Sequence, residues 1–321
     1  MHADVVDNVA PMDQVRWLNQ PTLRTPTVIA AFTGWNDAGD AASNAVRHLV
    51  ESWGAQALAE IDPEEFTDFA TVRPHVRLAD GFTRSIVWPT VGLWSASTPG
   101  GDVILVLGPE PALRWRHFTE QLIGVAQHHQ AGLVLTLGAL LADVPHTKPV
   151  QLIGTATDHE LISRFDLQRS RYEGPTGIVG VLHDACHNAG IDSASLWAAV
   201  PAYASQVPSP KASLALVTRA CGIIGTPTPV GSLQQESADY EQRVGALVSD
   251  DDDLLGYVAR LETLSLDDEL DEDDDEDEDD DDTVGGELGD ADDLAPLDAA
   301  DLDSDELMAE VERFLRDQPD S

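Results

Sequence analysis

Seven polar side chains, most of which follow predicted strands, are the candidates for chemistry in this sequence. They are Asn36, Asp37, Asp40, Glu110, Asp143, His146 and Glu173. Carboxylates beside a histidine can transfer protons as general acid and base, and carboxylate oxygens can bind a divalent cation. If the strands are parallel, their carboxyl ends meet at one edge of the sheet, where open α/β sheets bind ligands. We therefore take these residues as ligand-binding candidates along one rim.

The same residue types also have a purely structural interpretation. With Asp37 as the N-cap of a helix, Asp40 falls at the third helical position, which makes a variant of the capping box. Glycine, proline and carboxylates after strands set turns without any ligand. We favour this interpretation for the acids, and we leave open whether His146 lines a cleft.

No motif in the sequence names a cofactor or a metal. The chain has no Gly-x-Gly-x-x-Gly after a strand, no Walker loop and no Gly-x-Ser-x-Gly elbow. Its two cysteines, Cys186 and Cys221, have neither zinc-ligand spacing nor a disulfide framework. Cys186 has histidines nearby, but a buried helical cysteine explains it better than a reactive thiol. The ligand therefore stays unnamed, and no metal is expected.

Alternating strands and helices are expected to position the candidate residues. Continuous apolar runs typical of buried strands occupy residues 27–32, 102–107, 132–141 and 194–200. Weaker strands are predicted over residues 55–61, 66–69 and 176–182. Residues 84–94 are predicted to form a strand pair or a bulged strand, because Pro89 cannot donate to a central ladder. Helices are predicted over residues 39–53, from Pro111 to about 126, 158–165 with Thr157 as cap, a short one up to 188, and 210–224. A last helical segment is predicted over residues 234–264, interrupted at residues 250–253. This alternation predicts a mostly parallel sheet with helices on both faces.

The charge of the chain is concentrated at one end. The 321 residues include 58 acids and 18 bases, a net charge of −40. From Asp250 onward there are 33 acids and 3 bases, so this end alone carries −30. Nucleic acid is a poor partner for such a chain, because binding to phosphates needs a basic surface.

The sequence predicts one folded domain with appendages. We expect an N-terminal arm over residues 1–26, an α/β/α domain over 27–266, a disordered acidic linker over 267–302 and an amphipathic helix over 303–316. The apolar stripe of that terminal helix needs a partner surface, because a helix of this length is marginal alone in water.

No targeting or membrane segment is evident in the sequence. The first residues lack the basic region and apolar core of a signal peptide. No apolar run approaches the ~18 residues of a membrane span. We therefore expect a cytoplasmic protein that binds neither membranes nor nucleic acid.

Five segments together resemble the proteasome assembly chaperone family, type two, in its actinobacterial branch. They are residues 32–40 (FTGWNDAGD), 108–111 (GPEP) with Trp115, 137–146 (LGALLADVPH), 172–180 (YEGPTGIVG) and 195–201 (SLWAAVP). The resemblance covers about residues 27–262. It implies a three-layer α/β/α sandwich, similar to the nucleoside phosphorylase and hydrolase-like fold, usually in a homo-oligomer. A trimer is the first expectation that it gives.

The resemblance implies an oligomeric assembly or scaffold protein that is not an enzyme. The alternative is a small-molecule-binding enzyme, a hydrolase or a phosphorylase-like transferase, with its site at the strand rim. Family chaperones that dock on the proteasome ring resemble each other in a hydrophobic–tyrosine–any tail, whereas residues 318–321 here are QPDS. Docking by that tail is therefore not expected, and the terminal helix is a candidate surface for a protein partner.

Overall fold

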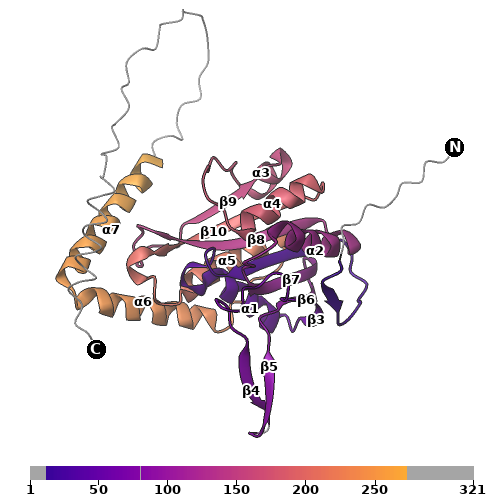
Figure 1. Ribbon diagram of the computed structural model, residues 1–321. Coiled ribbons are helices and arrows are strands. Elements are labelled where there is room, and N and C mark those ends of the chain that lie inside the picture. The colour runs from indigo at the N-terminus through magenta and orange to yellow at the C-terminus, as the bar shows by residue number, and fades with distance from the viewer. Residues whose placement is uncertain (1–11, 80, 273–321) are drawn as a thin grey trace, which may run out of the picture. The chain divides into compact units, whose positions relative to one another are not determined.

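A mixed eight-stranded sheet forms the centre of the computed structural model, which describes residues 12–79 and 81–272 (Figure 1). The strands across the sheet are, in order, β1 (Val15–Trp17), β3 (Gln56–Ile61), β6 (Val91–Thr98), β7 (Gly101–Pro109), β2 (Thr27–Thr33), β8 (Leu133–Ala142), β10 (Ser193–Pro201) and β9 (Leu152–Ala156). The four strands β7, β2, β8 and β10 are parallel, and the outer strands pair antiparallel. The expected α/β fold is confirmed, with its parallel strands confined to the centre.

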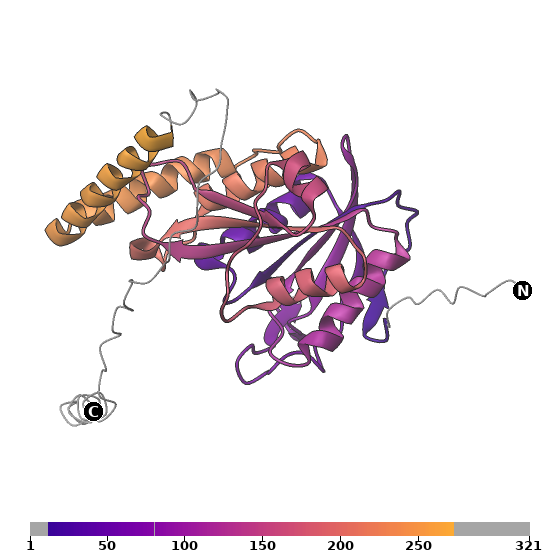
Figure 2. The ribbon, with the colours of Figure 1, turned by 90° about the horizontal axis from the view of Figure 1, so that it is seen from above.

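Helices cover both faces of the sheet and complete the three layers (Figure 2). Helices α1 (Ala41–Ser52) and α5 (Pro210–Ile224) pack on one face, and α2 (Trp115–His128) and α4 (Ile178–Asn188) pack on the other. Successive side chains of β2 alternate between the two cores, because strand residues point to opposite faces. Thus Ile29 and Ala31 join the first core, while Ala30 and Phe32 join the second.

The remaining helices extend the domain at the ends of its strands. A 3₁₀ turn, η1 (Ala38–Asp40), precedes α1, and a second, η2 (Ala202–Ala204), follows β10. Helix α3 is His159–Phe165, α6 is Leu233–Ser249 and α7 is Asp252–Glu272. Tyr240, Val244 and Val248 of α6 pack with Ala204 and Val258 into a small third core. Since α7 continues to Glu272, the predicted linker does not begin at residue 267; residues 273–302 and the predicted helix 303–316 lie outside the described residues.

A two-stranded hairpin stands apart from the main sheet. Strands β4 (His75–Ala79) and β5 (Thr83–Val87) pair only with each other among the described residues, and the hairpin projects from the body (Figure 1). Of the two alternatives for residues 84–94, the strand pair is correct, but its strands, β5 and β6, belong to different sheets and are separated near Pro89. Proline cannot donate to a ladder, which explains the break.

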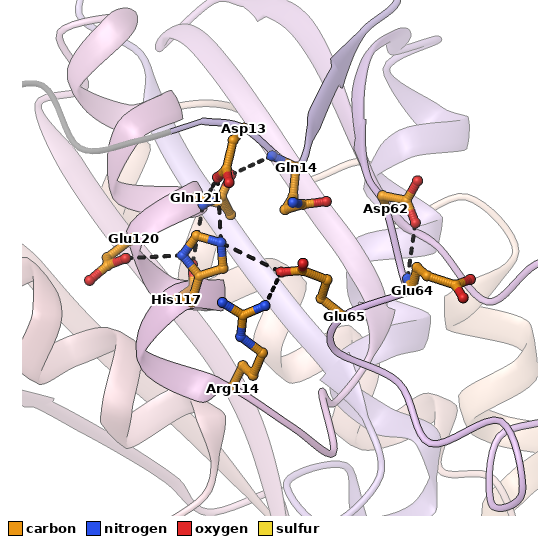
Figure 3. A network of polar contacts seen from close by, with 9 residues as sticks. All are labelled: Asp13, Gln14, Asp62, Glu64, Glu65, Arg114, His117, Glu120 and Gln121. Carbon is orange, nitrogen blue, oxygen red and sulfur yellow. Dashed lines mark hydrogen bonds and ion pairs between the residues drawn. The ribbon is translucent and has the colours of Figure 1, made fainter.

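Residues 12–26, predicted as part of an arm, belong to the domain. Strand β1 pairs with the outer edge of β3. The segment before it is held by α2: Gln121 donates from its side-chain amide to Asp13 and accepts from the backbone amide of Gln14, at 3.0 Å each (Figure 3). His117 lies 3.4 Å from the Asp13 carboxylate in the same network. The boundary of the domain therefore lies before β1.

Two of the predicted strands are wrong. Residues 176–182 form the start of helix α4, in which Ile178, Val179, Leu182 and Cys186 are buried. That spacing places all four on one helical face. Within residues 176–182 alone, however, the pattern of apolar residues cannot be distinguished from that of a short buried strand. Residues 66–69 form no strand; the carbonyl of Phe66 accepts from the amides of two residues after β7, and its ring packs in the core.

Two helix starts also differ from prediction. Helix α2 begins at Trp115, not at Pro111, after Arg114 in the left-handed conformation. Helix α3 is capped by Asp158, which accepts hydrogen bonds from the amides of two residues in the first turn, and not by Thr157. Residues 111–114 and Asp158, which were predicted to lie inside α2 and α3, thus precede these helices. No helix among the described residues is long and apolar enough to cross a membrane.

Candidate functional site

The ends of β2 and β7 bring the first group of candidate residues together. Asn36 follows β2 and is 1% exposed, and its side-chain Nδ2 donates to Glu110 Oε1 at 2.7 Å. The backbone amide of Ile178, the first residue of α4, donates to the same oxygen at 2.8 Å. Glu110 therefore connects the turn after β2 with the start of α4, where a negative charge is also favourable for the helix dipole.

Asp37 caps helix α1 from outside the helix. Its Oδ1 accepts from the amides of Ala42 at 2.8 Å and Ser43 at 3.1 Å. The capping role predicted for Asp37 is confirmed, but η1 separates it from the helix. Asp40 is exposed, has a φ of 52° and makes no side-chain bond to the helix start. Asp40 therefore does not complete the predicted capping box.

Two oxygens of this group have no partner among the described residues. Asn36 Oδ1 and Asp37 Oδ2 are both buried without a hydrogen bond there. Burial raises the pKa of Asp37 above 3.8 and outweighs the hydrogen bonds from Ser43 and Ala42, which lower it. A Cβ on Gly177, the residue before α4, would overlap the Asn36 amide. This group is therefore closely packed, and the raised pKa makes the Asp37 carboxyl a candidate for proton transfer.

His146 belongs to a second group with its own partners. The Tyr203 hydroxyl accepts from the backbone amide of His146 at 2.7 Å and lies 2.8 Å from the ring Nδ1. Lys211 Nζ donates to the carbonyl of His146 at 2.7 Å and forms an ion pair with Glu241 at 2.6 Å. Burial and the charge of Lys211 lower the pKa of His146. A neutral ring can accept the Tyr203 proton at Nδ1, so the geometry and the pKa direction agree.

The environment of Tyr203 and the adjoining pocket limit what this second group can do. Burial raises the pKa of Tyr203 to about 12, so its hydroxyl stays protonated at neutral pH. The pocket beside His146, lined also by Ser209 and Tyr240, has a volume of about 10 Å³. That is room for roughly one water molecule. The open question about His146 is thus answered: it lines a pocket, but one of water size.

The last two candidates lie at the surface. Asp143 accepts from the Tyr257 hydroxyl of α7 at 2.7 Å, and the neighbouring Thr147 donates to Glu262 of α7 at 2.5 Å. Glu173 is exposed in the segment before α4. The candidates therefore divide into separate groups, and among residues 12–79 and 81–272 no group of three or more His, Cys, Asp or Glu side chains is placed to hold a metal ion.

The sequence contained no signal for several residues of these groups. Tyr203, Lys211 and Tyr257 meet their partners across 57 to 114 residues, and none belongs to a recognisable motif. Cys186 is fully buried in α4, so the interpretation of a buried helical cysteine is confirmed, and burial raises the pKa of its thiol to about 12.

Comparison with known proteins places this geometry in a family. The model of the PAC2 family matches residues 31–248. The structure of a PAC2 family protein from Streptomyces avermitilis is 44% identical, with a TM-score of 0.68, and the match covers 73% of this chain and 99% of that one. A proteasome-assembly chaperone homologue from Mycobacterium tuberculosis is also 44% identical, with a TM-score of 0.66 and coverage of 72% and 99%.

A more distant structure shares the fold. A protein of unknown function from Corynebacterium glutamicum has a TM-score of 0.72 at 22% identity, over 81% of this chain and 99% of that one. A search of the curated proteins finds no match. The matched residues 31–248 contain both groups of polar residues described above. From the family model and the two structures at 44% identity we conclude that this chain belongs to the PAC2 family.

Proposed function

We propose that this protein is a homo-oligomeric assembly or scaffold protein that acts as a chaperone for other proteins and is not an enzyme. The observation that carries the proposal is the 44% identity, over 99% of its length, to the M. tuberculosis protein described as a proteasome-assembly chaperone homologue. By that likeness, the clients are subunits of a large ring-shaped protease. The expected trimer, the cytoplasmic location and a protein partner for the segment 303–316 are parts of the same proposal.

The chemistry of the rim supports the proposal. Glu110 and Asp37 accept hydrogen bonds from backbone amides at the starts of α4 and α1, which makes them caps. His146 is fixed by Tyr203 and Lys211 through its backbone as well as its ring. Groups that already hold the fold together in this way are poorly placed to move during a reaction.

The direct test is reconstitution of protease assembly. Purified full-length protein is mixed with separately purified α- and β-subunits of an actinobacterial proteasome core, and assembly is followed on native gels. We expect the protein to co-migrate with incomplete particles, to be absent from mature cores and to speed their formation. An unrelated protein of similar size and charge serves as the control. Unchanged kinetics without co-migration would contradict the proposal.

One observation favours the enzyme alternative. Asn36 Oδ1 and Asp37 Oδ2 are buried without partners in the described part of the chain, and a polar ligand or an ordered water would satisfy them. A thermal-shift screen of nucleosides, phosphorylated metabolites and divalent ions addresses this alternative. The variants are Asp37→Asn, Asp143→Asn and His146→Ala, with the exposed Asp40→Asn as control. A ligand shift that stable variants lose would favour an enzyme, and an inert screen would end this alternative for the rim.

A further inference from the structure

The rim carries large apolar side chains that nothing among residues 12–79 and 81–272 covers. We define the rim patch as the exposed apolar residues at or just beyond the ends of β2, β7 and β8 and in the segment before α4: Trp35, Leu113, Leu141 and Tyr172. Trp35 and Tyr172 are 66% and 67% exposed, and the two leucines are each 50% exposed. Exposed apolar patches mark interaction sites, and tryptophan and tyrosine are frequent anchors of protein interfaces. The rim patch is therefore a candidate surface for a partner.

Hydrogen bonds hold the loops that carry the rim patch. Trp35 is followed by Asn36, whose side chain donates to Glu110 at 2.7 Å. The same carboxylate accepts from the amide of Ile178 at the start of α4, and the amide of Ala139 in β8 donates to the carbonyl of Asn36 at 2.8 Å. The segments after β2 and β7, the end of β8 and the start of α4 are thus joined. A surface held in this way loses little conformational entropy when a partner binds.

The rim patch suits a macromolecule better than a small molecule. The amide of Leu113 donates to the carbonyl of Phe66 at 3.0 Å, and the hollow beside them, lined also by Pro109 and Pro111, has a volume of about 10 Å³. That is room for roughly one water molecule, whereas pockets for small ligands have about 300–1,000 Å³. A partner that fits here covers the exposed side chains and does not enter the fold.

The charge around the rim patch selects the kind of partner. Exposed acids outnumber exposed bases among the described residues of the rim: the acids are Asp40, Asp143 and Glu173, and the bases are Arg171 and Arg114. Arg114 is already paired with a glutamate. The whole chain has a net charge of −40, so its long-range field also attracts basic surfaces. The complementary partner is therefore apolar in its centre and basic around it.

We propose that the rim patch is the client-binding surface of this protein, and that it takes a client segment in which apolar side chains are flanked by lysine or arginine. The inference rests on the proposed assembly function, and it names the surface and the partner chemistry through which that function acts. The apolar side chains of the client cover Trp35 and Tyr172, and its basic side chains lie against Asp40 and Glu173. Charge brings the client to the surface, and the aromatic anchors hold it there.

Two double variants of the full chain test the proposal. The anchor variant is Trp35→Ser with Tyr172→Ser, and the charge variant is Asp40→Asn with Glu173→Gln. All four side chains are exposed, so both variants are expected to keep the circular dichroism, the melting temperature and the oligomeric mass of the wild type. The probes are the separately purified α- and β-subunits of an actinobacterial proteasome core, and their binding is measured by biolayer interferometry.

The two variants should weaken binding in different ways. We expect the anchor variant to bind at least about 30-fold more weakly than the wild type, as for the loss of an interface anchor. The charge variant should associate several-fold more slowly at low salt, and its association rate should depend less on ionic strength.

Each variant has a matched control. Leu247→Ser with Leu255→Ser, at two exposed leucines of α6 and α7, controls for the loss of exposed apolar side chains. Glu51→Gln with Asp192→Asn removes two exposed acids at the opposite edge of the sheet, at the end of α1 and just before β10. Both controls should bind the subunits as the wild type does.

Four outcomes would overturn the inference. If the anchor variant binds as tightly as the wild type, the client is held elsewhere, and the proposed function stands without this surface. If the charge variant keeps the wild-type association rate at low salt, the client segment is not basic. If the anchor variant loses the oligomeric mass of the wild type in light scattering, the rim patch is a contact between copies of this chain. If the wild type itself binds neither subunit, the proposed function is contradicted and the inference falls with it.

Discussion

Asn36 and Glu110 lie 74 residues apart in the sequence and are joined by a hydrogen bond of 2.7 Å between the side-chain amide and the carboxylate. The same carboxylate oxygen receives the amide of Ile178 at 2.8 Å. One side chain thus holds the turn after β2, the end of β7 and the start of α4. We expect changes to this group and to the His146 group to alter the stability of the fold.

Removal of the Glu110 carboxylate should destabilise the protein. Glu110→Ala leaves the amides of Asn36 and Ile178 without their acceptor, and a buried donor without a partner costs about 1–3 kcal/mol. Denaturant unfolding measures this cost. Glu173→Ala, at an exposed glutamate of the same rim, should change the free energy of unfolding by less than about 0.5 kcal/mol. Equal effects of the two variants would show that the connection contributes nothing.

Gly177 should tolerate no side chain. A Cβ there would overlap the Asn36 amide, so Gly177→Ala must push apart the turn and the start of α4, at a cost of about 1–3 kcal/mol. Gly222 in α5 is the matched control, because a Cβ there meets nothing within 4 Å. Gly222→Ala should stabilise the helix by about 0.5–1 kcal/mol. Thermal unfolding of both variants distinguishes a steric effect from a general response to alanine.

The pH dependence of stability should reveal the burial of Asp37. Its pKa is raised in the folded state, mainly by burial, so the folded protein holds this proton to higher pH than the unfolded chain does. Stability linked to this group is therefore lost as the pH rises from 3.8 upward. Asp37→Asn keeps an acceptor oxygen and cannot titrate. As the pH rises over that range, the free energy of unfolding of Asp37→Asn should therefore increase relative to that of the wild type. A difference between the two proteins that stays constant with pH would contradict the prediction.

His146 should affect stability with the opposite sign. Burial and Lys211 lower its pKa in the folded state, so below pH 6.5 the unfolded chain takes up a proton that the folded one resists. The contribution is therefore present above pH 6.5 and lost as the pH falls through and below that value. Below pH 6.5, the free energy of unfolding measured in denaturant melts should therefore fall less steeply for His146→Gln than for the wild type. The exposed His75→Gln serves as the control for replacing a histidine at the surface.

The buried strands and the best-capped helix could be predicted from sequence. The apolar run at residues 102–107 is central to β7, which lies under helices on both faces, and such burial leaves a continuous signal. Helix α5 has the predicted bounds because Ser209 caps it, Pro210 begins it and Gly225 ends it in the left-handed conformation. In both cases local chemistry and tertiary structure agree.

Elements whose local signal is weak were missed. Strand β9 is a short edge strand whose exposure alternates irregularly, without the period of a half-buried strand. Strand β4 does alternate, with Val76 and Leu78 on one face and His75 and Arg77 on the other, but five residues are too few for that pattern to stand out in the sequence. The start of α4 was misassigned because its apolar residues satisfy a strand and a helix equally over one turn.

The candidate site was predicted in part. The cap role of Asp37 follows from a carboxylate at a strand-to-helix turn, which is a local pattern. The partners of Glu110 and His146 could not be predicted, because they lie 57 to 74 residues away and depend on the packing of whole elements. Sequence patterns therefore indicated which residues were polar and placed at turns, but not what each of them contacts.

The position of β2 in the sheet has a consequence for synthesis of the chain. β2 (Thr27–Thr33) is among the first strands to leave the ribosome, yet its neighbours are β7 (Gly101–Pro109) and β8 (Leu133–Ala142). At roughly 5–20 residues per second, translation takes on the order of 5–20 s from β2 to the end of β8. Both edges of this buried strand stay open until β7 has emerged, and one edge stays open until β8 follows. The nascent chain must therefore be shielded during that time from pairing with its neighbours on the same messenger.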